Sequence, residues 1–141
     1  MSRRDTYHET VKQALINDGW RISHDLFPIT YEGTTVSTDL GAERVAGAEG
    51  QRIAVEIIAV EVKDFDSRSL FSEFEKALGQ FRLYQALLKR IDPDRVMFLA
   101  IRKETYNTFF QRPAIQVALD DNEIRLIVFD EYREEVVQWI K

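Results

Sequence analysis

The chain has 141 residues, 45% of them hydrophobic and 30% charged, with a formal net charge of −5. This length suits one domain with a substantial core, and we expect residues 1–141 to form a single domain. Cysteine is absent, which excludes disulfides, a thiolate zinc site and a cysteine nucleophile. With only two histidines, any metal would be held mainly by oxygen ligands, which favours magnesium, calcium or manganese.

Hydropathy and charge also bear on location and partners. No apolar run approaches the ~18 residues that a membrane helix needs, and the charged N-terminal segment does not match a secretory signal. We therefore expect a cytoplasmic protein with no membrane partner. The acidic balance argues against broad, non-specific coating of DNA, because that requires clustered Lys and Arg. A local basic patch, or a partner that supplies positive charge, is still compatible with DNA binding.

In chain order, the first third of the sequence predicts one helix and then extended structure. Apolar residues at helical spacing precede Gly19, a typical C-terminal stop. The Thr- and Val-rich stretch that follows predicts a hairpin whose second arm ends near Asp39. We expect a helix over residues 3–18, an extended segment over 20–31, a turn at 32–33, a second strand over 34–40 and a connection over 41–50.

A long central strand is predicted next, over residues 52–65, and its almost continuous apolar middle is typical of a strand covered on both faces. The sequence nearly repeats itself inside this strand, so that Glu56 and Glu61 occupy equivalent places five residues apart. Strand side chains alternate, so these two carboxylates should face opposite sides of the sheet unless a bulge intervenes.

The remainder of the chain alternates helices and strands. A helix with an apolar stripe runs to Arg90, and Asp92-Pro93-Asp94 ends it. A later helical segment is expected to break near Pro113. The later elements are a helix from near Ser69 or Ser72 to 90, a strand over 96–101, helical structure over 103–119, and strands over 124–129 and 135–140. The order α-β-β-β-α-β-α-β-β predicts an α/β fold with a central mixed sheet flanked by helices.

Charge at the end of the central strand is the first sign of function. Glu61 and Lys63 are two residues apart and share a face, and Asp39 could supply a second carboxylate. Two acids and a lysine suit phosphodiester hydrolysis, because the acids can hold Mg²⁺ while the lysine orients water and stabilises negative charge. A solvated Glu–Lys pair beside a turn acid is the simpler explanation, and spacing alone favours it, since such patterns arise readily by chance.

Three further side chains are candidates. Glu9 in the first helix could add a third acid over the site, although a solvated helix carboxylate is the favoured explanation. Gln80 and Tyr84 share a helix face and could position a nucleic-acid strand or the lysine, or serve ordinary packing. His8 and His24 have no partner at a recognisable motif spacing, so we assign them no role.

Blocks along nearly the whole chain carry a family resemblance. They are Tyr7-His8-Glu9 to Gly19-Trp20, Asp39 to Arg44, Ile53 to Ile57, Phe74, Ala77 to Phe81, Tyr84, Pro93 to Val96, Leu99 to Ile101 and Val137 to Ile140. The chain resembles the XisH family, named for controlling excision of the fdxN DNA element. The resemblance implies a restriction-endonuclease-like fold with a PD-(D/E)xK site, and a role in site-specific DNA rearrangement with a partner, XisI.

Mapped onto this sequence, the resemblance implies Asp39 as the first acid and Glu9 as a helix acid. Gln80 and Tyr84 correspond to the glutamine and tyrosine of the RecB-like branch. One departure concerns the lysine, because the family pattern places it two residues after the equivalent of Glu56.

Here Ile58 occupies that place, and the lysine follows only the second copy, as Lys63. Downstream spacing favours Glu61 and Lys63 as the functional pair. The upstream register would instead put Glu56 and Ile58 at the site, without a lysine.

Two functions therefore stay open. One is a DNA endonuclease dependent on Mg²⁺ or Mn²⁺, with Asp39 and Glu61 as metal ligands, that works with an XisI-like protein. The other is a non-catalytic regulatory subunit that uses the same scaffold to bind XisI, DNA or a recombinase. The acidic charge and the interrupted motif favour the regulatory subunit, whereas the retained site residues favour the nuclease. A homo-oligomer is also left open.

Overall fold

A six-stranded mixed sheet forms the centre of the computed structural model, which describes residues 6–47, 50–51, 53–66 and 68–141. Its strands are Arg21–His24 (β1), Leu40–Ala46 (β4), Ile53–Val62 (β5), Val96–Arg102 (β6), Leu126–Asp130 (β7) and Glu135–Ile140 (β8). Their order in the sheet is β1-β4-β5-β6-β7-β8. β5, β6 and β7 are parallel, and the other neighbours are antiparallel. The predicted central mixed sheet is confirmed.

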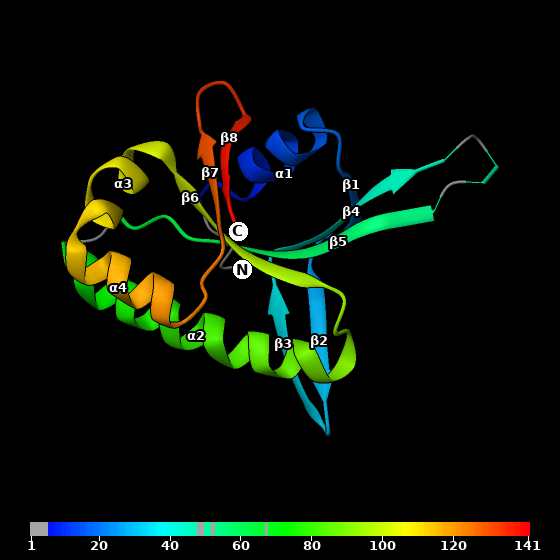
Figure 1. The fold of residues 1–141 in the computed structure, drawn as a ribbon, viewed down its shortest axis with the longest axis horizontal. Helices are drawn as coiled ribbons and strands as arrows, with labels where there is room; N and C mark the ends of the chain where they lie inside the picture. Colours follow the sequence, from blue (N-terminus) through cyan, green and yellow to red (C-terminus); the bar gives the residue numbers. More distant parts are fainter. Residues whose placement is uncertain (1–5, 48–49, 52, 67) are drawn as a thin grey trace.

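Helices cover both faces of this sheet (Figure 1). They are His8–Asn17 (α1), Leu70–Ile91 (α2), Lys103–Asn107 (α3), the 3-10 turn Phe109–Gln111 (η1) and Pro113–Asp121 (α4). Val11 and Leu15 of α1 pack in one hydrophobic cluster with Val60 of β5. The cluster on the other face joins α2, η1 and α4 to residues such as Ala59. Neighbouring residues of β5 thus enter opposite clusters, as strand alternation requires.

The predicted hairpin is present, but it forms a sheet of its own. Phe27–Tyr31 (β2) pairs with Thr34–Thr38 (β3), and the pair lies below the main sheet beside α2 (Figure 1). Glu32 and Gly33 form the turn with φ of 46° and 83°, and positive φ at both central residues is typical of a type I′ hairpin turn. Phe27 and Ile29 anchor the hairpin in the core on the α2 side.

The prediction of a connection over residues 41–50 is wrong for the first six of these residues, because they belong to β4. Gly41, Glu43 and Arg44 lack the apolar alternation of a strand, but β4 hydrogen-bonds to β1 on one side and to β5 on the other. Pairing on both sides therefore outweighs weak local propensity. The strand expected over 34–40 ends at Thr38, which places Asp39 at the junction of β3 and β4.

The later predictions agree closely with the structure. The helix after β5 begins at Leu70, which matches the start near Ser69, and helical structure over 103–119 divides before Pro113. The central strand ends at Val62, three residues earlier than expected. Residues 3–5 of the expected first helix, and Arg52, lie outside the described residues.

Among the described residues, no helix combines the length and apolar character that crossing a membrane requires.

Candidate active site

The carboxyl end of β5 carries the acid and the lysine that the sequence singled out. Glu61, only 6% exposed, lies opposite Leu99 in the parallel ladder with β6. Gln80 of α2 bridges the pair: its Nε2 donates to Glu61 Oε2 at 2.6 Å, and Lys63 Nζ donates to its Oε1 at 3.1 Å. One amide therefore sets the distance between the carboxylate and the ammonium group.

Asp39 reaches the same strand end from the β3–β4 junction. Leu40 is paired with Val60, so the ladder brings the residue before Leu40 level with the end of β5. Asp39 is buried, and its Oδ2 accepts the backbone N–H of Val62 at 2.7 Å. Val62 lies between Glu61 and Lys63 in the sequence, and the Asp39 carboxylate is therefore fixed at the backbone of the strand end that carries both residues.

The negative charges of both carboxylates affect the pKa of Tyr84. Burial is the main cause that raises the pKa of its phenol above the ordinary value, and the negative charges of Glu61 and Asp39 raise it further. A hydrogen bond with Gln80 acts in the opposite direction without reversing the shift. The two residues expected to share a face of the helix, Gln80 and Tyr84, thus both face the strand end that carries the acids.

The alternative register of the near-repeat is not what the structure adopts. Glu56 is exposed, lies opposite Arg44 in the ladder with β4, and approaches Lys141 at 3.8 Å between carboxylate and ammonium. Ile58 is buried in the cluster on the α1 side. Both residues therefore lie away from Asp39, and Glu61 is the glutamate of the near-repeat that meets Gln80.

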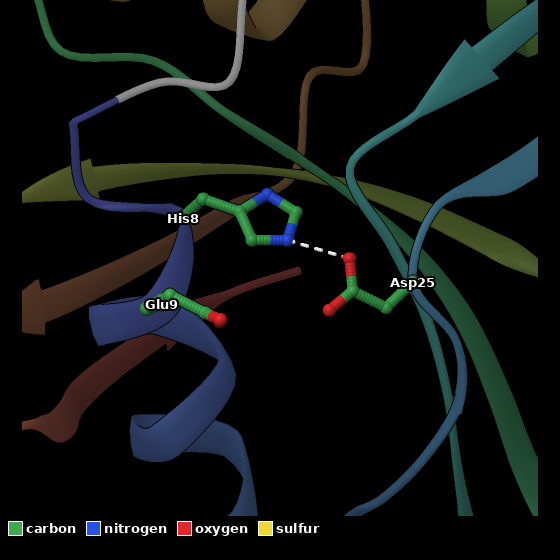
Figure 2. Close-up of side chains that lie close together, drawn as sticks. All are labelled: His8, Glu9 and Asp25. Carbon is green, nitrogen blue, oxygen red and sulfur yellow. Dashed lines mark hydrogen bonds and ion pairs between the residues drawn. The ribbon is translucent and has the colours of Figure 1, made fainter. Parts of the chain in front are cut away.

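Glu9 is exposed and belongs to a different group of side chains. It lies near His8 and Asp25, and one potential ligand atom from each falls within 4.8 Å of the others (Figure 2). Lys12 Nζ already donates to Asp25 Oδ2 at 2.9 Å. Because this ammonium neutralises Asp25, the group resembles a hydrogen-bonded network more than a second cation site.

His8 is the residue that sequence reasoning missed. It is 2% exposed, its Nε2 lies 2.7 Å from Asp25 Oδ1, and its Nδ1 lies 3.3 Å from Asp39 Oδ1. Figure 2 shows the ring directed at Asp25. The partners are 17 and 31 residues away in sequence, so no local spacing could reveal them. The one available sign was the inclusion of His8 in the first block of the family resemblance.

The Asp25 carboxyl is held in its ionised form. Burial opposes ionisation, but hydrogen bonds from Lys12 and His8, together with their charges, outweigh it and lower the pKa of Asp25 below its ordinary value. A chain of contacts therefore runs from Lys12 through Asp25 and His8 to Asp39.

The donors at the strand end fit a hard divalent cation. Two buried carboxylates, Asp39 and Glu61, offer the oxygen ligands that Mg²⁺ and Mn²⁺ prefer. Lys63 and Gln80 complete a polar cluster at the carboxyl ends of parallel strands, where α/β sheets commonly bind ligands.

The fold and this cluster define a mixed α/β protein with an acid–lysine–glutamine site at the end of its central strand. The family profile described as XisH protein matches residues 1–137, and the chain belongs to the XisH family. No protein with a curated description matches the chain.

Two solved structures show the same fold. An XisH family protein from Nostoc punctiforme PCC 73102 is 40% identical, with a TM-score of 0.85, over 97% of this chain and 100% of that one. A fdxN element excision controlling factor protein from Anabaena variabilis is 41% identical, with a TM-score of 0.84, over 98% of this chain and 100% of that one.

Proposed function

We propose that this protein hydrolyses DNA phosphodiester bonds at the end of β5, using a restriction-endonuclease-like arrangement of the PD-(D/E)xK type. The observation that carries the proposal is the convergence of Asp39 and Glu61, with Lys63 and Gln80, on one strand end. The relative named as an excision controlling factor supports DNA as the substrate.

Each residue has a role that its contacts support. Asp39 and Glu61 would hold one Mg²⁺ or Mn²⁺, which supplies Lewis-acid chemistry when bound. Lys63 orients the attacking water and stabilises negative charge as it develops on the phosphate. Gln80 keeps the Lys63 ammonium at a fixed position relative to Glu61, since it contacts both. Tyr84 stays a neutral hydrogen-bond donor beside the acids, because its pKa is raised.

DNA binding by this chain needs help from a partner. A net charge of −5 repels the phosphate backbone, and DNA affinity depends on neutralising phosphates with Lys and Arg. We therefore assign the positive charge to an XisI-like protein, and the complex to DNA excision. Gel-shift titrations at low salt should show weak binding by this chain alone and tight binding by the complex. Tight binding by the isolated chain, with a steep dependence on salt, would remove the need for a partner.

A non-catalytic regulatory subunit is the second candidate function, and one observation favours it. Both carboxylate oxygens of Asp39 already have partners within the chain, namely His8 and the Val62 N–H. A closed network of this kind stabilises the scaffold without a cation, and the scaffold would then serve to bind a partner, DNA or a recombinase.

Cleavage assays distinguish the nuclease from the non-catalytic regulatory subunit. The chain and its XisI-like partner should nick plasmid DNA in Mg²⁺ or Mn²⁺ and stop in a chelator. Asp39→Asn and Glu61→Gln should each abolish cutting, and Lys63→Ala should remove most of it. Glu56→Gln is the matched control, since it makes the same change on the opposite face of β5 and should leave cutting intact.

The regulatory candidate predicts no cleavage by any of these proteins and unchanged partner binding by all of them. Metal-dependent cutting that survives both carboxylate substitutions would place the chemistry elsewhere.

A further inference from the structure

A small hollow at the amino ends of the parallel strands is lined by basic residues, whereas Asp39 and Glu61 lie at the carboxyl end of β5. The hollow has a volume of about 140 Å³ and lies between the last turns of α2 and the starts of β6 and β7. The charged residues of its described lining are Lys89, Arg95 and Arg125, and that lining contains no acid. In a chain with a net charge of −5, this hollow departs locally from the overall acidic balance.

Arg95 is held in a fixed position at this hollow. Its side chain is only 10% exposed, its Nε donates to Asp92 Oδ2 at 2.8 Å, and its Nη1 donates to the backbone carbonyl of Ile58 at 3.0 Å. The guanidinium also lies over the ring of Phe27, 4.5 Å from the ring centroid. Nη2 has no hydrogen-bond partner among the described residues. A guanidinium fixed in this way can donate to an anion with little further loss of side-chain freedom.

The other two cations have no partner in the described part of the chain. Lys89 is exposed in the last turn of α2, whereas Arg125 is half-buried just before β7, and its backbone carbonyl accepts the N–H of Leu99 at 2.9 Å. Neither the Lys89 nor the Arg125 side chain forms a hydrogen bond or an ion pair with a described residue. Because Asp92 offsets the charge of Arg95, two positive charges at the hollow are left without a carboxylate partner.

Helix stability explains only part of this charge. Basic residues at the end of a helix offset the partial negative charge of its last carbonyls, and α2 carries both Lys89 and Arg90 there. Arg125 belongs to a different segment, so this explanation does not extend to it. Arg125 also lines an adjoining hollow of about 260 Å³, but acidic and basic residues are equal in number in the described lining of that hollow. The smaller hollow is therefore the one that favours an anion.

We propose that Arg95, Arg125 and Lys89 bind a phosphate group, either as free phosphate or as part of a nucleic-acid backbone. A guanidinium can donate two parallel hydrogen bonds to phosphate oxygens, and the ammonium group adds a further charged donor. Leu88 and Met97, each 2% exposed, form an apolar part of the wall, and a low local dielectric strengthens such charged contacts. The hollow is several times larger than the ~30 Å³ that one water occupies, so it has room for a tetrahedral oxyanion.

Calorimetric titration of the full chain with inorganic phosphate, against chloride at equal ionic strength, tests the proposal. The wild type should show saturable binding. Arg125→Gln should weaken it by at least about tenfold, because it removes a hydrogen bond between charged groups, and Lys89→Gln should weaken it as well. Arg90→Gln is the matched control for Lys89→Gln: it removes the same charge from the next residue of α2 and should change the affinity by less than about twofold. Circular dichroism shows whether the variants fold.

Two results would overturn the proposal: no saturable binding of phosphate by the wild type, or an affinity that neither Arg125→Gln nor Lys89→Gln changes. The titration needs no DNA cleavage, so its result is independent of the proposed nuclease activity.

A competition experiment distinguishes the two sources of the phosphate group. If a short single-stranded oligonucleotide displaces inorganic phosphate from the wild type, and Arg125→Gln weakens the oligonucleotide whereas Arg90→Gln does not, the group belongs to a nucleic-acid backbone. If inorganic phosphate stays bound in the presence of excess oligonucleotide, the site binds a free anion.

Discussion

The Asp39 carboxylate accepts the backbone N–H of Val62 at 2.7 Å, and this bond joins the start of β4 to the end of β5. The ladder between these strands includes the pair Leu40 and Val60. Just beyond that pair, a side chain takes the place of a backbone acceptor. The bond therefore satisfies a buried N–H and, at the same time, fixes a carboxylate at the strand end from which Glu61 and Lys63 project.

The first prediction concerns the ionisation of Tyr84. Glu61 and Asp39 both raise the pKa of this phenol, so Asp39→Asn and Glu61→Gln should each lower it towards the ordinary value. Glu56→Gln should leave it unchanged, because Glu56 lies on the opposite face. The alkaline absorbance titration, compared with that of Tyr84→Phe, measures the shift. An unaltered Tyr84 pKa in both site variants would mean that the acids do not converge on the phenol.

The second prediction concerns the Gln80 bridge. Gln80→Met removes a hydrogen bond to the buried Glu61 carboxylate, and bonds to charged groups contribute about 1.5–3 kcal/mol each. Helix propensity is nearly unchanged by this substitution. Urea denaturation should therefore show a loss of that size, whereas Gln85→Met on the same helix should cost much less. Equal losses at the two positions would argue against a specific role for the bridge.

The third prediction concerns stability in acid. The pKa of Asp25 is lowered in the folded protein, so its contribution to stability is complete above the unfolded value of about 3.9. The contribution is lost as the pH falls through the folded pKa. Asp25→Asn should lower the free energy of unfolding at neutral pH and flatten its dependence on pH in the acid range.

Lys12→Met removes one of the groups that lower the Asp25 pKa and should give an intermediate profile. Chemical denaturation between pH 2 and 7, read by fluorescence, follows all three proteins. If the wild type and Asp25→Asn lose stability in parallel below pH 5, Asp25 does not supply this dependence.

The fourth prediction concerns the close approach of two segments at Gly41. A Cβ added there would lie 3.0 Å from Phe27 Cδ1 and 3.1 Å from His24 Nδ1. Gly41→Ala should therefore destabilise the protein by about 1–3 kcal/mol, the usual cost of overpacking. Gly79 in α2 is the contrasting case, since nothing lies within 4 Å of its added Cβ.

Gly79→Ala should stabilise the protein by roughly 0.5–1 kcal/mol, because alanine loses less backbone entropy in a helix. Thermal denaturation of the two variants should thus shift in opposite directions. A stabilising Gly41→Ala would show that β4 and the β1–β2 segment are less tightly packed than the structure indicates.

The local spacing of residues in the sequence determined several features of this protein. The turn at Glu32-Gly33, the shared face of Glu61 and Lys63, and the shared helix face of Gln80 and Tyr84 all follow from spacings of a few residues. Such features depend on backbone geometry that neighbouring residues set by themselves, and they are therefore visible in a single sequence.

Only the tertiary structure decided which residues meet. β4 exists because β1 and β5 pair with it on either side, and that pairing carries Asp39 to the end of β5. The same ladders, with β4 and with β6, place Glu61 rather than Glu56 at the site. His8 meets Asp39 across 31 residues of sequence. Contacts of this kind depend on strand pairing and on the packing of α1 against the sheet, which no local spacing encodes.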